Sequence, residues 1–277
     1  MSRSQTRRIG HFTMHRALKY AKYRYRKARA LSQEKGLELV WRFHPDAMAS
    51  RRRLRAFKNA HQGERCFIIG NGPSLKSTDL SLLRNEVTFG LNRIYLMFDE
   101  IGFETTYHVA VNKLVVEQTA DEISALSMPS FLSWHSREML DFSPSTTYLR
   151  SIHRGGPRFF TDIENGMWEG ATVTYVAMQI AFYMGFSKVI LIGVDHSFQT
   201  KGKPHQTVVS PGDDPNHFSP KYFGEGFRWQ LPDLETSELA YRIANHTFKS
   251  SGREIVDATI GGKLDVFDKV GYKALFA

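Results

Sequence analysis

The stretch CFIIGNGPSL at residues 66–75 decides the fold class. Its four apolar residues run directly into a Gly-Asn-Gly turn, a pattern typical of a buried strand that ends at a sharp turn. Glycines at 70 and 72 let the chain bend and let a ligand approach the backbone without a Cβ in the way. The backbone N–H groups of this turn suit a phosphate, as do those of a following helix capped by Ser74 or Thr78. The stretch predicts a nucleotide-binding turn.

The common nucleotide-binding fingerprints are absent around this turn. The dinucleotide pattern needs a third glycine where this chain has Leu75, and there is no Walker pattern. A tight strand-to-helix turn without a ligand is therefore the alternative interpretation of residues 70–72.

Further apolar runs on both sides of this stretch predict a layered α/β sheet. The run VILIG at 189–193 is the clearest of them, and shorter strand candidates lie at 87–91, 107–111, 129–133, 147–149 and 254–256. Helices are expected at 172–184, with Gly185 as its C-cap, and at 235–250, with Thr236 or Ser237 near its start. Alternating strands and helices indicate an α/β, Rossmann-like, mostly parallel sheet flanked by helices.

Residues 199–233 differ from the rest of the chain. They are rich in Pro, Gly, His and Asp and show no hydrophobic period, so we expect a long loop or lid. Structureless segments of that length are uncommon and are often functional.

The basic charge of the chain is concentrated at its N-terminal end. Residues 1–60 hold 17 Lys and Arg against 3 Asp and Glu, whereas residues 61–277 hold 20 against 25. Residues 1–60 are expected to be helical, with a break at Gly36 and a new stretch from Pro45 that includes RRRLR at 51–55. This basic helical N-terminal arm suits contact with anionic membrane lipid. The alternative is a solvated extension that packs on the body or forms a homo-oligomer; a nucleic-acid partner is not expected from an acidic body without a known motif.

Composition limits the class of protein. Cys66 is the single cysteine, which excludes an internal disulfide framework or a multi-cysteine zinc site and fits a reducing compartment. No signal-peptide h-region and no run of about 18 apolar residues is present. We expect a cytoplasmic protein, or one at the inner face of the membrane.

Residues 70–75 resemble the opening motif of bacterial CMP-sialic-acid transferases of the lipooligosaccharide type. They are also similar to a related superfamily of motility-accessory flagellin glycosyltransferases and 6-hydroxymethylpterin diphosphokinase-like proteins. The similarity continues in order through four more segments, over roughly residues 64–270. These segments are LNRIY at 91–95, VNKLVVEQ at 111–118, GFSKVILIGVD at 185–195 and NHF at 216–218.

This resemblance implies a glycosyltransferase that moves a sialic-acid-like sugar from a CMP-activated donor to a surface-glycan acceptor without a metal. His217 would act as the base on the acceptor hydroxyl, because a histidine can accept a proton near neutral pH. The implied set of nucleotide-binding residues is Gly70, Asn71, Gly72, Ser74, Asn92, Thr172, Gly193 and Asp195, with Asn112 near the donor.

The chain departs from the sialyltransferase pattern at the leaving phosphate. The first of two phosphate-stabilising tyrosines aligns with Ser197 and the second has no counterpart, so Tyr222 or Arg228 is expected to substitute. The diphosphokinase alternative needs ATP and Mg²⁺, with Asp79, Asp195, Asp213 and Asp214 as candidate ligands. A third interpretation is a non-catalytic nucleotide-binding protein. We expect no cofactor, a basic arm at 1–60 and a Rossmann-like catalytic domain at 61–277.

Overall fold

The computed structural model describes residues 35–140 and 143–277. The chain divides into two compact units with the boundary between Met48 and Ala49. Most of the predicted arm, residues 1–34, lies outside the described residues. Within the described ranges, no helix combines the length and the apolar character that a membrane span requires.

The described end of the arm is helical. Residues 35–43 form one helix, so the break predicted at Gly36 is wrong: a single glycine lowers helix stability by about 1 kcal/mol, which neighbouring residues can offset. Helix α2 (Pro45–Phe57) begins at Pro45, as predicted, because proline is well tolerated at the first helical position.

Residues 49–60, which the sequence analysis assigned to the arm, are tied to the α/β unit. Arg55 donates to the Glu164 carboxylate at 3.0 Å, and Lys58 donates to Asp162 at 3.0 Å. Leu54, which lies between basic residues in the sequence, is fully buried. Part of the basic charge of the arm is therefore paired with acidic residues of the body.

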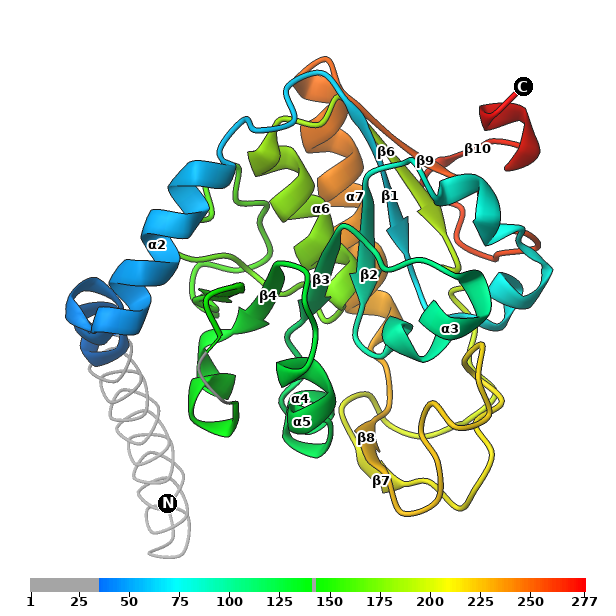
Figure 1. The fold of residues 1–277 in the computed structure, drawn as a ribbon, viewed down its shortest axis with the longest axis horizontal. Coiled ribbons are helices and arrows are strands. Elements are labelled where there is room, and N and C mark those ends of the chain that lie inside the picture. Colours follow the sequence, from blue (N-terminus) through cyan, green and yellow to red (C-terminus); the bar gives the residue numbers. More distant parts are fainter. Residues whose placement is uncertain (1–34, 141–142) are drawn as a thin grey trace, which may run out of the picture. The chain divides into compact units, whose positions relative to one another are not determined.

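An eight-stranded parallel sheet forms the α/β unit, in the order β10-β9-β6-β1-β2-β3-β4-β5 (Figure 1). Every neighbouring pair is parallel, so the predicted Rossmann-like class is confirmed. The strands are β1 (Arg65–Ile69), β2 (Thr88–Leu91), β3 (Tyr107–Ala110), β4 (Ser130–Ser133), β5 (Thr146–Leu149), β6 (Lys188–Ile192), β9 (Glu254–Asp257) and β10 (Asp268–Lys269). The strands predicted from the apolar runs correspond to β1–β6 and β9.

The two faces of the sheet carry two separate cores. Cys66 and Ile68 of β1 belong to one core, whereas Phe67 and Ile69 belong to the other, as alternation along a strand requires. Long helices cover the first face: α6 (Val173–Met184) and α7 (Leu234–Ser250), which contact each other. The second face packs against short segments: η1 (Pro73–Ser77), η2 (Leu80–Leu83), η3 (Ile94–Met97), η5 (Lys273–Leu275) and α3 (Phe98–Ile101). The remaining helices are α4 (Lys113–Gln118), α5 (Ala120–Ser124) and η4 (Trp134–Met139).

Both long helices match their predicted spans. Thr172 caps α6 by accepting a hydrogen bond from the Thr174 N–H, and Gly185 ends the helix with φ of 95°. Helix α7 starts one residue early, with Thr236 and Ser237 near its start as predicted, and its N-cap is Asp233. Asp233 accepts from the Thr236 N–H at 3.0 Å, and a carboxylate also suits the positive end of the helix dipole.

The helix expected directly after the glycine turn is absent. The chain forms the five-residue 3₁₀ segment η1, with Ser74 inside it and Thr78 as its C-cap rather than its N-cap. Ser74 is held by Asp195, and Thr78 turns to an extended conformation with ψ of 124°. The turn after β1 therefore offers no α-helix N-terminus to a phosphate, contrary to the prediction.

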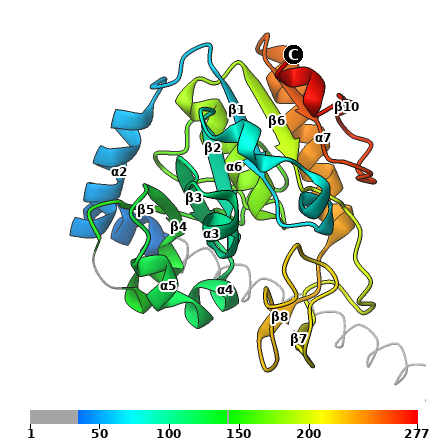
Figure 2. The same cartoon turned by 45° about the vertical axis from the view of Figure 1, so that its right-hand side comes forward.

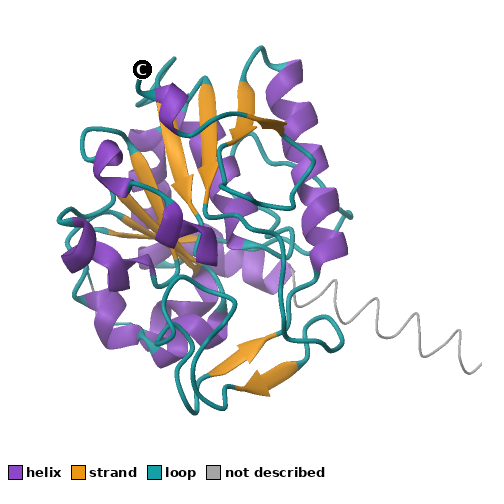
Figure 3. Ribbon diagram, turned by 90° about the vertical axis from the view of Figure 1, so that its right-hand side faces the viewer, coloured by secondary structure: helices purple, strands orange, loops and turns teal. Residues whose placement is uncertain are grey.

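The predicted lid, residues 199–233, is largely loop but not entirely. It contains a two-stranded antiparallel sheet of β7 (Thr207–Val209) and β8 (Arg228–Gln230). Figures 2 and 3 show this pair apart from the main sheet, near the end toward which the strand arrows point. Hydrogen bonding between distant segments created the pair, and neither three-residue strand is long enough to give a pattern in the sequence.

Candidate functional site

The point where the sheet reverses its order defines the site. From β1 the chain proceeds through β2 to β5 on one side, whereas β6, β9 and β10 extend from the other side of β1. Open α/β sheets place their ligands outside the carboxyl ends of the strands at such a switch point. A cavity of about 330 Å³ opens there, within the size range of small-molecule sites.

Two glycine-containing turns interlock at this point, after β1 and after β6. The Gly72 N–H donates to the Gly193 carbonyl at 2.9 Å. A Cβ at Gly70 would lie 2.3 Å from the Gly193 oxygen, and one at Gly72 would lie 1.8 Å from Asp195 Oδ2. The close approach of the two turns therefore requires glycine at 70 and 72 even without a ligand.

Ser74 and Asp195, both predicted to hold the nucleotide, bond to each other. Asp195 Oδ2 accepts from the Ser74 hydroxyl at 2.6 Å, and Oδ1 accepts from the Ser74 N–H at 3.2 Å. Asp195 lines the cavity together with Gly193, but Ser74 is not among the lining residues. This pair fastens the segment after β1 to the turn after β6.

The side-chain amide of Asn71 is held in place by one hydrogen bond, and its oxygen is left without a donor in the described part of the chain. Its Nδ2 donates to the Leu91 carbonyl at 3.0 Å, while its buried Oδ1 has no hydrogen-bond partner among the described residues. Its backbone oxygen accepts from the Phe218 N–H of the lid at 2.9 Å. An unpaired buried amide oxygen costs about 1–3 kcal/mol, so a ligand that donates to it recovers free energy.

Asn92 lies at the cavity with φ of 48°, a left-handed conformation. His108 of β3 donates from Nε2 to the Asn92 carbonyl at 2.7 Å. Burial lowers the pKa of His108 to about 4, so the ring is neutral at pH 7. His108 was missed by the sequence analysis; the one signal was a titratable residue within an apolar strand.

Left-handed backbone clusters at this cavity. Five non-glycine residues have positive φ in the part of the chain that the structure describes, and all except Asn59 line the cavity: Asn92, Ala171, His196 and His205. Such conformations cost of order 1–3 kcal/mol each and concentrate at functional sites. The clustering marks the cavity as the candidate functional site.

His217 of the lid is held in one orientation. Its Nδ1 lies 2.7 Å from Asp214 Oδ2, so the ring donates to a carboxylate that is almost fully buried. The ring stacks on Tyr222 with centroids 4.0 Å apart and meets the edge of Phe223 at 4.9 Å. With Nδ1 committed to Asp214, Nε2 carries the lone pair that can accept a proton.

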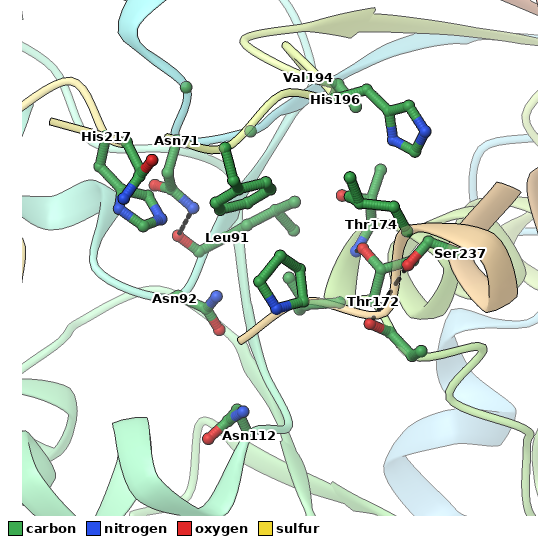
Figure 4. Close-up of a pocket in the computed structure, with 18 of the residues that line it drawn as sticks. Asn71, Leu91, Asn92, Asn112, Thr172, Thr174, Val194, His196, His217 and Ser237 are labelled. Atoms are coloured by element: carbon green, nitrogen blue, oxygen red, sulfur yellow. Dashed lines mark hydrogen bonds between the residues drawn. The ribbon is translucent and has the colours of Figure 1, made fainter. Parts of the chain in front are cut away.

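Polar residues occupy opposite walls of the cavity (Figure 4). Asn71, Asn92 and His217 lie on one side, and Asn112 lies below them, where its Oδ1 caps α4 by accepting from Leu114 and Val115. The other side is formed by His196, Thr172, Thr174 and Ser237. The Thr172 hydroxyl also lies 3.2 Å from that of Tyr241.

Each histidine that lines the cavity lies near a carboxylate. His205 is 3.1 Å from Asp233, and His196 is 3.8 Å from Glu238. Burial lowers the pKa of His196, and the Thr236 N–H lowers that of Asp233. No cluster of three or more metal-ligating side chains occurs within residues 35–140 and 143–277.

Two of the predicted catalytic residues, like Ser74, do not line the cavity. Tyr222 is fully buried behind His217, and burial raises the pKa of its hydroxyl. Arg228 lies on β8 and pairs with Glu117 at 2.9 Å. Both residues act within the lid or on its attachment, away from the space where a ligand fits.

The four acids considered for a metal are likewise dispersed. Asp79 caps η2 and Asp213 is exposed, and neither lines the cavity. Asp214 holds His217 and Asp195 holds Ser74. Asp79, Asp195 and Asp214 are thus engaged in separate structural hydrogen bonds.

Arg93 joins the lid to the body, a role that sequence analysis did not detect. Its guanidinium donates to the carbonyls of Lys221 and Tyr222, pairs with Glu122 at 3.2 Å, and lies over the Phe227 ring. Gln118 adds a second attachment, exchanging two 2.8 Å hydrogen bonds with the backbone of Arg228.

Comparison with known proteins gives one family and a few distant structures. The family model described as 6-hydroxymethylpterin diphosphokinase MptE-like matches residues 46–201, more than half of the chain. No curated protein matches the sequence. The MAf glycosyltransferase structure from Magnetospirillum magneticum AMB-1 has 14% identity and a TM-score of 0.48. A mammalian sialyltransferase in complex with Gal-beta-1-3GalNAc-ortho-nitrophenol has 12% identity and a TM-score of 0.34.

The aligned regions differ in how much of each protein they include. The MAf alignment covers 82% of this chain but only 38% of the MAf chain, so this chain spans well under half of that protein. The sialyltransferase alignment covers 77% of this chain and 79% of the other.

Proposed function

This chain belongs to the 6-hydroxymethylpterin diphosphokinase MptE-like family, and we propose that it is a glycosyltransferase that uses a CMP-activated sugar. The donor would carry a sialic-acid-like or related sugar, and the acceptor would be a hydroxyl of a surface glycan. The reaction would take place in the cytoplasm and need no metal.

The observation that carries this proposal is the chemistry of the cavity lining. Among the described residues that line it there is no lysine or arginine, whereas three carboxylates are present: Glu169, Asp195 and Asp233. Carboxylates in the lining repel a phosphate bound in the same cavity, and this repulsion grows with each added phosphate charge. The lining therefore favours a nucleotide with one phosphate, held by amides, hydroxyls and backbone N–H groups.

His217 has the arrangement that a general base needs. In the proposed step an acceptor hydroxyl attacks the anomeric carbon, its proton moves to Nε2 of His217, and the bond from that carbon to the phosphate oxygen breaks. CMP leaves with the bonding electrons, and Asp214 stabilises the imidazolium that forms. Tyr222 supports the ring through stacking, a different role from the phosphate contact expected from the sequence.

The name of the family favours a second candidate, a diphosphokinase that uses ATP and Mg²⁺. This reaction needs acidic ligands for the metal. The residues present do not fit that requirement, because Asp79, Asp195, Asp213 and Asp214 are not brought together. We therefore rank this activity second.

The proposal is tested by measuring CMP release from a panel of CMP-sugars, with a chelator present and with glycan acceptors. Wild-type protein is expected to release CMP, while His217→Ala still binds CMP in a calorimetric titration but releases none. AMP formation from ATP and 6-hydroxymethylpterin only with Mg²⁺ would replace the proposal with the diphosphokinase. CMP binding with no turnover on any donor would favour a non-catalytic nucleotide-binding protein.

A further inference from the structure

The helix at residues 35–43 exposes an unusual number of large apolar side chains. Leu37, Leu39, Val40 and Phe43 have 40–65% of their surface exposed, and Phe43 is the most exposed of them. All four fall within nine residues, and we call them the apolar arm face. Scattered exposed apolar residues are normal, but a contiguous group of this kind marks an interaction surface.

The four side chains share one side of the helix. Leu37 and Val40 are three residues apart, Leu39 and Phe43 are four apart, and Val40 is three before Phe43, so they are neighbours at helical spacing. The charged residues Lys35, Glu38 and Arg42 fall on the remaining arc. The helix is amphipathic, and its apolar side faces solvent.

Charge selects the kind of partner. Residues 1–60 carry 17 Lys and Arg against 3 Asp and Glu, and Arg55 and Lys58 among them pair with the body. Two copies of such a segment repel each other, which disfavours a self-association through this face. A nucleic acid offers phosphates but no apolar layer for Leu and Phe. An anionic bilayer offers both, because apolar side chains insert at the headgroup boundary while basic ones meet lipid phosphates.

We propose that the apolar arm face docks on an anionic lipid bilayer, with Lys35 and Arg42 of the same helix contacting the headgroups. Leu39 and Phe43 are the main inserting side chains, because they are the most exposed of the four. This inference is independent of the reaction that the cavity carries out.

The test is co-sedimentation of the full chain with vesicles at about 0.1 M salt. One set of vesicles contains equal parts of phosphatidylglycerol and phosphatidylcholine, and the other contains phosphatidylcholine alone. Wild-type protein is expected to bind the anionic vesicles at least about tenfold more tightly, because the charge of the arm acts only on anionic lipid.

Paired variants separate the face from general charge effects. Leu39→Glu with Phe43→Glu is expected to reduce binding at least about tenfold. Leu239→Glu with Ile260→Glu adds the same charge at two exposed apolar residues of the body, and is expected to change binding less than about twofold. Leu39→Ser with Phe43→Ser removes the apolar groups without adding charge and is expected to lie between them.

Three results would overturn the inference. The first is unchanged vesicle binding by both arm variants, and the second is equal binding of wild type to neutral and anionic vesicles. The third is a dimer in light scattering that the arm variants dissociate, with no vesicle binding, which would assign the face to a second copy. Far-ultraviolet circular dichroism checks that all variants keep their fold.

Discussion

The two parts that enclose the cavity are built in different ways. The turns after β1 and β6 end central strands that are buried and hydrogen-bonded on both sides. The lid is joined to the body by hydrogen bonds from Phe218 to Asn71, from Arg93 to two lid carbonyls and from Gln118 to Arg228. It also contributes buried side chains to the core on the second face of the sheet: Phe218, Tyr222, Phe223, Trp229 and Leu231. The sheet edge therefore fixes the shape of the site, whereas the lid supplies His217, the proposed base.

This difference suggests that the sheet edge and the lid have different roles. In the proposed reaction, the edge of the central sheet would hold the nucleotide, and the lid, which belongs to no strand of that sheet, would open to admit an acceptor. Substitutions at the edge should then change binding and folding, and substitutions in the lid should change turnover or access. The following predictions test this difference in roles, from the largest expected effect to the smallest.

Removal of the lid histidine should have the largest effect. His217→Ala is expected to lower turnover by about 10²- to 10⁴-fold, the usual contribution of a general base, with CMP affinity unchanged. Initial rates and calorimetric titrations measure the two quantities. His246→Ala, at an exposed position on α7, serves as the control. Near-normal turnover of His217→Ala would remove the histidine from the mechanism.

Loss of the Arg93 contacts should make the lid more accessible to proteases. Arg93→Met removes hydrogen bonds from a buried guanidinium to two lid carbonyls, each worth about 1.5–3 kcal/mol because the donor is charged. Limited proteolysis is expected to cut residues 199–233 at least about tenfold faster. Arg84→Met, which loses only contacts near Gly102, should leave that rate unchanged. Equal cleavage in both variants would show that Arg93 does not hold the lid.

A side chain added where the turns after β1 and β6 meet should lower the stability of the protein. In Gly72→Ala the new Cβ would overlap Asp195 Oδ2, so that carboxylate must leave Ser74. We expect a loss of about 1–3 kcal/mol in the free energy of unfolding and weaker CMP binding. Gly224→Ala in the lid is the matched control, since its Cβ would meet no atom closer than 3.8 Å. Urea unfolding that is unchanged in Gly72→Ala would refute the interlocked turns.

The stability that buried His108 contributes to the folded protein should depend on pH. The pKa of His108 falls from 6.5 to about 4 on folding because the ring is buried. Its contribution to stability is therefore present above pH 6.5 and is lost as pH falls toward 4. Urea unfolding at pH 7 and pH 5 should differ by about 2 kcal/mol from this group, on the scale of 1.36 kcal/mol per pKa unit.

Two variants test whether His108 is the source of this pH dependence of the unfolding free energy. His108→Gln should remove this part of the pH dependence, whereas His246→Gln, at an exposed position, should retain it. If the unfolding free energy of His108→Gln changed between pH 7 and pH 5 as much as that of the wild type, the pH dependence would belong to other groups.

Elements with strong local signals were predictable from the sequence. The apolar runs at 66–69 and 189–192 became β1 and β6, and the helix ending at Gly185 became α6, because burial on both faces leaves a clear pattern. The turn Gly70–Gly72 and the strand-end residue Asp195 line the cavity at the carboxyl ends of the strands, and their contact with a nucleotide stays a prediction.

Features that depend on distant contacts were not predictable. The helix expected after Gly72 became a 3₁₀ segment because Ser74 bonds to Asp195, 121 residues away. His108 and Arg93 act through residues in other segments, so their own neighbours give no signal. Tyr222, which was expected at the leaving phosphate, lies behind His217 instead, since nothing in the lid sequence shows which side faces the cavity.

The central claim is that the cavity at the switch point binds a nucleotide with one phosphate and without a metal. A calorimetric titration of CMP into the wild-type protein, with a chelator present, tests it most directly. We predict saturable binding that Asn71→Leu abolishes, because the fixed amide and its unused acceptor are lost. No heat from CMP, together with binding of ATP only when Mg²⁺ is added, would contradict the claim.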